Sequence, residues 1–133
     1  HSDLRRQRQM CIRDRLKNMR KIETNMNKAI RHAEDFRSSN TTVTHAINDA
    51  GQSEAYVHLH GNHIATISCT AITLFDGGWQ SNTTKSRLNA LCQEFAPYAF
   101  VFQKNWDWYV SQKGTHGKNI KSDFVDGFTL PIK

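Results

Sequence analysis

The spacing of apolar residues changes once along this chain, near Asn40, and that change restricts the possible folds most. Before Asn40, apolar residues recur every three or four positions, as in an amphipathic helix, and we predict a helix over residues 20–37. After Asn40, apolar and polar residues alternate in short runs separated by turn-forming residues, as in strands with one buried face. A helix followed by a series of short strands predicts an α+β fold.

Turn-forming residues divide the segment 41–76 into three strands of a meander. The pair Gly61 and Asn62 has the composition of a two-residue hairpin turn, so the strands on either side of it should pair directly. That register puts Leu59 opposite Ile64. Local pairing of this kind produces antiparallel sheets.

A second helix is predicted over residues 83–96, where apolar residues again recur at helical spacing. Asn82, Thr83 or Thr84 can cap its first turn. A β-hairpin and a last strand are expected over residues 98–131. The order is therefore α-βββ-α-βββ, a mostly antiparallel sheet of about five to six strands with two helices packed on one face.

Positive charge is concentrated at the start of the chain. The formal net charge of +6 would on its own suggest nucleic-acid binding. Residues 1–21 hold eight basic and two acidic side chains, which accounts for the whole excess, and the remainder of the chain is electrically balanced. The net charge therefore does not identify the domain as a nucleic-acid-binding protein.

The first fifteen residues differ in composition from the rest. Residues 4–15 contain five arginines without a sustained apolar period, and the string RQMCIRDR resembles a translated sequencing adapter found at the ends of metagenomic reading frames. We expect residues 1–15 to be a non-native leader and residues 16–133 to form a single domain. A genuine basic arm that binds phosphate or an acidic partner is the alternative.

Composition also argues against several classes of protein. No apolar run approaches the ~20 residues that span a bilayer, so we predict no membrane partner. Cys11, Cys69 and Cys92 are odd in number and lack framework spacing, which favours free thiols in a reducing compartment. No phosphate-binding loop, serine elbow or paired-carboxylate pattern is present, so we assign no catalytic residue and no cofactor, and favour a protein without enzymatic activity.

Three histidines lie close together around the first predicted turn. In an extended strand, His58 and His60 project from the same face, which is the arrangement of a two-histidine metal clamp. The predicted register puts His63 opposite His60. Because no third firm ligand stands at a suitable spacing, two interpretations remain open: a metal site built on His58, His60 and His63, or a polar surface that faces solvent.

The segment 79–87 combines features of an anion-binding site. Gly77 and Gly78 permit an unusual backbone path before it. Lys85 and Arg87 fall near the start of the predicted helix, where exposed N–H groups and basic side chains suit phosphate. The alternative is a capped helix with two solvated cations. The predicted binding residues are Trp79, Gln80, Asn82, Thr83, Thr84, Lys85 and Arg87, with Lys104 from the second hairpin.

The second predicted hairpin, with its turn at residues 104–105, is rich in aromatic residues. Trp106 and Trp108 share one face of the following strand, and Tyr109 lies on the other. We expect at least one of the two tryptophans in the core; an exposed pair would form a platform for base stacking or protein docking. Residues 112–122 are predicted to form a flexible loop.

Several strings together resemble a family of small proteins encoded by tailed bacteriophages, including marine and cyanobacterial phages. They are NTTV at 40–43, VHLHGNHIA at 57–65, ITLFDGGWQSNTTKSRLNAL at 72–91, VFQKNWDWYV at 101–110 and FVDGF at 124–128. The resemblance implies a phage origin and a working place in the host cytoplasm. It brings no catalytic residue with it, and the leader does not share it.

These observations lead to three functional hypotheses. The first is a non-enzymatic phage accessory protein that binds nucleic acid or a host or phage protein through segment 79–87 and Lys104. The second is a metal-binding protein or small metal-dependent enzyme that uses the three histidines. The third is a virion or assembly component, which would form stable oligomers and be present in purified particles.

Overall fold

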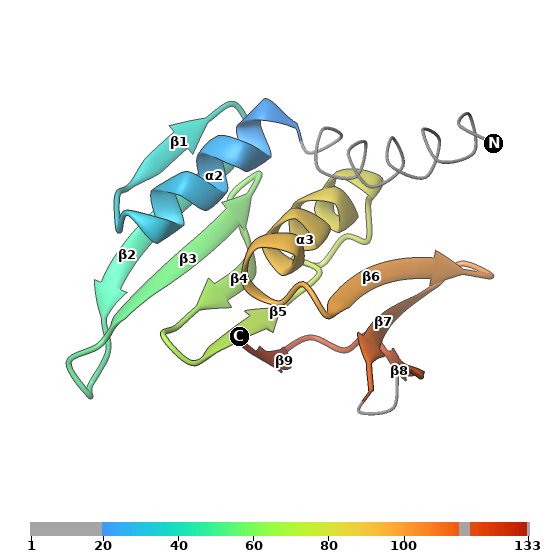
Figure 1. Ribbon diagram of the computed structural model, residues 1–133. Helices are drawn as coiled ribbons and strands as arrows, with labels where there is room; N and C mark the ends of the chain where they lie inside the picture. The colour runs from blue at the N-terminus through green and yellow to red at the C-terminus, as the bar shows by residue number, and fades with distance from the viewer. Residues whose placement is uncertain (1–19, 115–117, 133) are drawn as a thin grey trace, which may run out of the picture.

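The computed structural model describes residues 20–114 and 118–132. In these ranges the chain forms two helices and two antiparallel sheets (Figure 1). The elements are α2 (Lys21–Arg31), β1 (Phe36–Ser38), β2 (Thr41–Ile47), β3 (Ser53–Leu59), β4 (Asn62–Ile67), β5 (Ala71–Leu74), α3 (Asn82–Phe95), β6 (Ala99–Lys104), β7 (Asp107–Lys113), β8 (Asn119–Asp123) and β9 (Phe128–Pro131). The predicted leader, residues 1–15, lies outside the described residues.

The arrangement confirms the predicted α+β fold with mostly antiparallel sheet. One sheet has the strand order β1-β2-β3-β4-β5-β9, and a second, smaller sheet has the order β6-β7-β8. α2 packs on β1 and β2, α3 packs on β4 and β6, and the helices contact each other, so both cover the same side of the larger sheet (Figure 1). No helix within 20–114 or 118–132 has the length and apolar character needed to cross a membrane.

α2 ends at Arg31 rather than at residue 37. The backbone turns away from the helix at Ala33, whose φ is 54°. Phe36 then begins β1, pairs with Val43 and packs against the core from a strand. The predicted helix over 20–37 was too long because Phe36 stands at helical spacing from the apolar residues of α2 but belongs to the sheet.

The first hairpin turns at His60 and Gly61, one residue earlier than predicted. Their φ angles are 53° and 79°, and two successive positive φ values are the mark of a type I′ turn. Leu59 consequently pairs with Asn62. The predicted pairing of Leu59 with Ile64 was wrong.

α3 covers residues 82–95, one residue earlier at each end than predicted. Its N-cap is Ser81, whose Oγ accepts a hydrogen bond of 3.1 Å from the backbone N–H of Thr84. The predicted caps Asn82, Thr83 and Thr84 therefore lie inside the helix.

The second hairpin turns at Asn105 and Trp106 rather than at 104–105. The segment 112–122 was predicted to be a flexible loop, but β7 extends to Lys113 and β8 begins at Asn119, so both ends of the segment are strand. Residues 115–117 lie outside the described part of the chain. Together, β6, β7 and β8 form a sheet of consecutive hairpins with one side turned toward the core (Figure 1).

Candidate functional site

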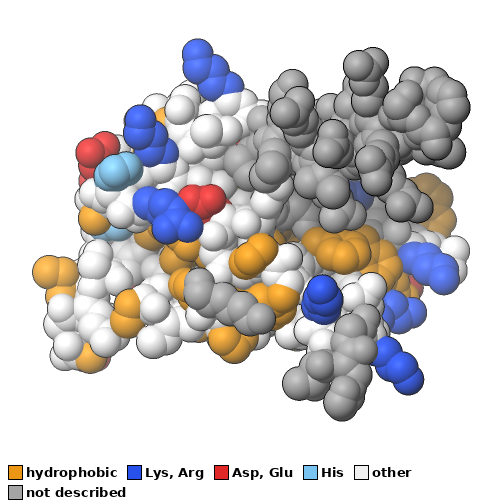
Figure 2. All heavy atoms as spheres, in the orientation of Figure 1, with side chains coloured by type: hydrophobic (Ala, Val, Ile, Leu, Met, Phe, Trp, Pro, Cys, Tyr) orange, Lys and Arg blue, Asp and Glu red, His pale blue; other side chains and the backbone are white. Residues whose placement is uncertain are grey.

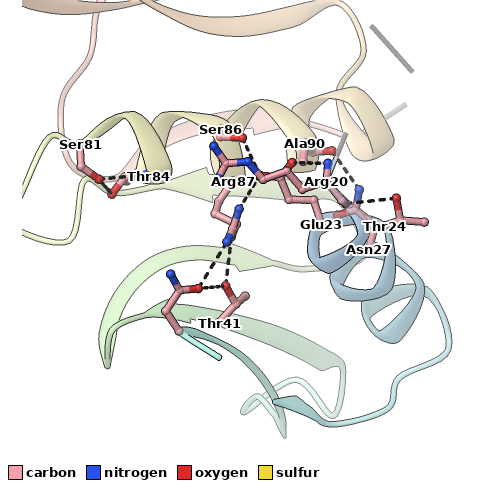
Figure 3. Close-up of polar contacts among 11 residues, drawn as sticks. Arg20, Glu23, Thr24, Asn27, Thr41, Ser81, Thr84, Ser86, Arg87 and Ala90 are labelled. Atoms are coloured by element: carbon pink, nitrogen blue, oxygen red, sulfur yellow. Dashed lines mark hydrogen bonds and ion pairs between the residues drawn. The ribbon is translucent and has the colours of Figure 1, made fainter. Parts of the chain in front are cut away.

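Arg87 lies inside the molecule, not on the predicted anion-binding surface. Its side chain is 3% exposed, and its Nη1 donates a hydrogen bond of 2.7 Å to Glu23 Oε2 on α2 (Figure 3). Its Nε donates to Thr41 Oγ1 at 3.0 Å and its Nη2 to Asn40 Oδ1 at 3.3 Å. A guanidinium with all of these partners is a structural cation, so the prediction that Arg87 binds a ligand was wrong.

Glu23 uses both carboxylate oxygens in the same network. Oε1 accepts a hydrogen bond from the backbone N–H of Arg20 at 3.0 Å, and Oε2 accepts one from Ser86 Oγ at 2.6 Å as well as the one from Arg87 (Figure 3). Asn27 Nδ2, one turn further along α2, donates to the carbonyl oxygen of Ala90 at 3.1 Å. These contacts join the two helices to each other and to β2.

The loop between β5 and α3 presents Trp79 to solvent, but basic side chains do not cluster there. Trp79, Gln80 and Asn82 are exposed, Thr83 and Lys85 are partly exposed, and Thr84 is buried. A hollow of about 140 Å³ beside the loop is lined by residues that include Asp76, His60 and Trp79. The Asp76 carboxylate accepts a hydrogen bond of 2.8 Å from the backbone N–H of Gly78. A carboxylate at this position disfavours a bound anion, which weakens the phosphate interpretation of the loop.

The three candidate metal ligands do not converge on one point. His60 occupies the exposed turn, and His58 rather than His60 pairs with His63, with ring centroids 5.3 Å apart. His63 Nε2 lies 2.7 Å from Thr66 Oγ1, so that ring nitrogen already has a protein partner. Among the residues that the structure describes, no group of three or more His, Cys, Asp or Glu side chains could hold a metal ion.

His63 lies against the ring of Phe75, with centroids 4.6 Å apart. Burial is the main cause that lowers the pKa of His63 below its usual value, and the neighbouring His58 lowers it further, while a backbone hydrogen bond at Ala65 opposes both. The folded chain therefore disfavours protonation of His63 relative to an exposed histidine.

A row of aromatic rings lies on the outer side of the smaller sheet. Phe102 pairs with Tyr109 across β6 and β7, and their rings stack with centroids 5.5 Å apart. Phe100, two residues before Phe102 and 44% exposed, continues the row with a centroid distance of 5.7 Å. Alternation along the strands turns Val101, Trp108 and Val110 to the opposite side, where they are buried in the core.

Lysines border these rings. Lys104 and Lys113 stand at alternate positions on the same side of the sheet, and Lys121 on β8 places its Nζ 4.6 Å from the centroid of the Tyr109 ring. Figure 2 shows apolar and basic side chains together at this end of the molecule. Asp107 and Asp123 share this side of the sheet but are outnumbered by the lysines. We call the outer surface formed by Phe100, Phe102, Lys104, Tyr109, Lys113 and Lys121 the aromatic face.

Trp106 stands at the tip of the β6–β7 hairpin, beside the aromatic face. It is 88% exposed and has a φ of 72°, in a turn position that glycine usually fills. A bulky side chain in this backbone region costs about 1–2 kcal/mol. Because its side chain is exposed, Trp106 does not offset that cost by packing in the core. Strained backbone conformations that are kept in this way are associated with functional sites.

α3 covers the free edge of β6 with a single side chain. Asn89 Nδ2 donates to the carbonyl oxygen of Val101 at 2.9 Å, and the N–H of Val101 donates to Asn89 Oδ1 at 2.7 Å. Asn89 thus reproduces the two hydrogen bonds that a neighbouring strand would make. It holds β6 on α3 and keeps the aromatic face in a fixed position relative to the core.

The structure brings one predicted binding residue, Lys104, into this face. The prediction that at least one tryptophan is buried is confirmed by Trp108, although Trp106 lies in the turn and does not share its strand face. Sequence reasoning missed Phe100, Phe102, Lys113 and Lys121. The alternation of Phe100 and Phe102 with Val101 indicates that the two phenylalanines share one side of a strand. It does not indicate which side of that strand is buried.

A family model described as Kyanoviridae Gp96 protein matches residues 19–131. This match agrees with the resemblance to small tailed-phage proteins, and it covers both sheets and both helices. No curated protein and no solved structure matches the chain. The match extends over far more than half of the sequence, and the chain therefore belongs to the Kyanoviridae Gp96 protein family.

Proposed function

We propose that this phage protein is an accessory protein that binds single-stranded nucleic acid on the aromatic face. The observation that carries the proposal is the row of Phe100, Phe102 and Tyr109 rings on the outer side of a sheet, bordered by lysines. Proteins that hold single strands without sequence preference combine such stacking surfaces with a basic track for the backbone.

Each part of the face has a separate role in this binding. The exposed ring of Phe100 offers one surface for a base, and Trp106 at the hairpin tip offers another. Lys104 and Lys113 are exposed and can neutralise phosphates on either side of the rings. Lys121 lies over Tyr109, and a base that replaced it there would leave its ammonium free for the phosphate backbone.

The proposal favours single strands over duplexes because base faces are open for stacking only when the bases are unpaired. Stacking on aromatic rings does not depend on the identity of the base, so we expect little sequence preference. Within an infected cell, this binding would take place in the host cytoplasm, where phage nucleic acid is copied.

The test uses the full chain with Arg5, Arg6, Arg8, Arg13 and Arg15 changed to Gln, so that leader charge does not dominate binding. Fluorescence anisotropy with labelled oligothymidine measures the Kd over a series of salt concentrations. Phe100→Ala should weaken binding by about 1–3 kcal/mol, which is roughly fivefold to more than a hundredfold in Kd. Lys104→Ala should reduce the slope of log Kd against log salt by about 0.7.

Two controls make the result specific. Phe100→Tyr keeps an aromatic ring and should retain most of the affinity. Lys28→Ala removes an exposed lysine from α2, away from the aromatic face, and should leave the affinity and the salt slope nearly unchanged. The proposal is wrong if the oligonucleotide does not bind, or if Phe100→Ala and Lys104→Ala bind it as tightly as the parent chain.

A further inference from the structure

β8 is an open edge of the smaller sheet. It pairs with β7 on one side, and no strand in the described residues lies on its other side (Figure 1). Other edges carry features that discourage further pairing: β1 has three residues, β9 contains Pro131, and Asn89 covers β6. β8 has five residues and no proline, and no hydrogen bond to its outer edge is found in the described residues. It carries two charged residues of opposite sign, Lys121 and Asp123, which repel a strand of like charge but attract one of complementary charge.

The backbone groups of β8 that face outward can be identified from a hydrogen bond just beyond its end. The N–H of Phe124 donates to the carbonyl oxygen of Trp108 on the β7 side, at 3.0 Å. Because successive residues of a strand point their backbone groups to opposite sides, Lys121 and Asp123 present their N–H and C=O groups to the open side.

We propose that a second copy of this chain pairs with β8 in antiparallel orientation, about a two-fold axis at Ser122. In this register Lys121 of one chain stands opposite Asp123 of the other, and the pair occurs twice. Each of these pairs forms two backbone hydrogen bonds because both residues face outward. Each also puts opposite charges side by side, which stabilises cross-strand pairing.

Exposed apolar side chains favour the same register. Ile120 and Val125 are each more than half exposed in the single chain. The two-fold axis at Ser122 puts Ile120 opposite Phe124 of the second copy, so Ile120 is covered, and Val125 follows directly after Phe124 at the end of the paired segment. A two-fold axis at Lys121 would instead put the two Lys121 side chains opposite each other, and like charges in that position are destabilising.

The pairing would join two aromatic faces into one surface. A two-fold axis perpendicular to the sheet keeps the same face of both chains on the same side, so β6-β7-β8 continues directly into β8-β7-β6 of the second copy. This consequence for nucleic acid rests on the proposed function. The pairing itself does not, and it is tested without nucleic acid.

The first test is sedimentation equilibrium of the full chain over a range of concentrations. We expect a reversible dimer. Lys121→Asp and Asp123→Lys each replace both attractive pairs by repulsive ones and should weaken dimerisation about tenfold. An equimolar mixture of the two variants should recover the affinity as a heterodimer, because each chain then supplies the charge that the other needs. Lys28→Asp, a charge reversal on α2, is the matched control and should dimerise like the parent chain.

The second test is independent of charge. In a background of Cys11→Ser and Cys69→Ser, Ser122→Cys places thiols across the two-fold axis, where Cα atoms of a non-hydrogen-bonded pair are about 4.5 Å apart. Mild oxidation by copper phenanthroline should link the chains. Asn119→Cys, on the same strand but away from the axis, should not link them.

The proposal is overturned if the full chain stays monomeric throughout the concentration range. It is also overturned if the chain dimerises but both charge reversals leave the affinity unchanged, or if Ser122→Cys crosslinks no better than Asn119→Cys. Circular dichroism of every variant identifies any that fail to fold. If the charge variants do not fold, the crosslinking pair decides the question.

Discussion

Glu23 on α2 and Arg87 on α3 form an ion pair of 2.7 Å in which both side chains are almost fully buried. The pair joins positions 64 residues apart in the sequence, and each member has further hydrogen-bond partners. Removal of either member would leave the other charged and buried without a partner, which costs more free energy than replacing both charges.

Arg87→Ala should therefore lower the free energy of unfolding by about 3–5 kcal/mol, measured by urea denaturation. Lys85→Ala, which removes a partly exposed cation from the same helix, should change it by less than about 0.5 kcal/mol. Glu23→Met with Arg87→Met should cost less than Arg87→Ala alone, because neither charge is then left unpaired. Equal losses for Arg87→Ala and Lys85→Ala would show that the pair does not hold the helices together.

Trp106→Gly should raise stability and weaken nucleic-acid binding in the same protein. Glycine accepts the positive φ of this turn position without strain, so the free energy of unfolding should rise by about 1 kcal/mol. Loss of the exposed ring removes one stacking surface and should increase the Kd for oligothymidine. Urea denaturation and anisotropy measure the two effects separately. Lower stability would contradict the strain argument, and unchanged affinity would remove Trp106 from the binding surface.

Stability should fall as the pH drops below about 6.5, partly because of His63. The folded chain lowers the pKa of His63 from its ordinary value of 6.5, mainly through burial and also through His58. In the window between the two pKa values the unfolded chain holds more protons, so acidification favours unfolding. His63→Gln should reduce the difference in melting temperature between about pH 7.5 and about pH 5.5, two values on either side of the ordinary histidine pKa. His32→Gln, at the exposed end of α2, is the control. An undiminished difference in His63→Gln would contradict the assignment.

Asn89→Leu should leave the N–H and C=O of Val101 without partners at the edge of β6. We expect a loss of about 1–3 kcal/mol in the free energy of unfolding. We also expect aggregation on heating, visible by light scattering, because an uncovered strand edge accepts other strands. Asn89→Asp keeps the acceptor for the Val101 N–H and loses the donor, so it should lie between Asn89→Leu and the parent chain. Wild-type behaviour of Asn89→Leu would contradict this account.

The alternation of apolar and polar residues predicted strands well where it was regular and where the paired strands are neighbours in the sequence. β2 begins at Thr41, where the predicted meander begins, because the run from Thr41 to Ile47 alternates and ends in turn residues. The hairpin turns were each placed one residue away, because His60 and Trp106 adopt positive φ where glycine or asparagine would be expected. Side-chain preference alone does not reveal that a histidine or tryptophan accepts such a conformation.

The candidate site was harder to predict because it depends on contacts between distant segments. Arg87 looked like a surface cation, and only the position of α2 shows that Glu23 lies beside it. Phe100 and Phe102 were missed because the sequence does not show which side of β6 is buried; α3 determines that side through Asn89 and the packing of Val101. Helix-to-sheet contacts of this kind leave no local pattern in the sequence.

The double hydrogen bond of Asn89 also sets a limit on how many chains can assemble through the smaller sheet. That sheet has two ends, β6 and β8, and the β6 end is already occupied by a side chain of the same molecule. The described part of each chain then has one open edge on this sheet, and an isologous contact uses the open edges of both partners. The proposed strand pairing at β8 would therefore be complete with two chains, and would give a closed pair instead of a growing fibre.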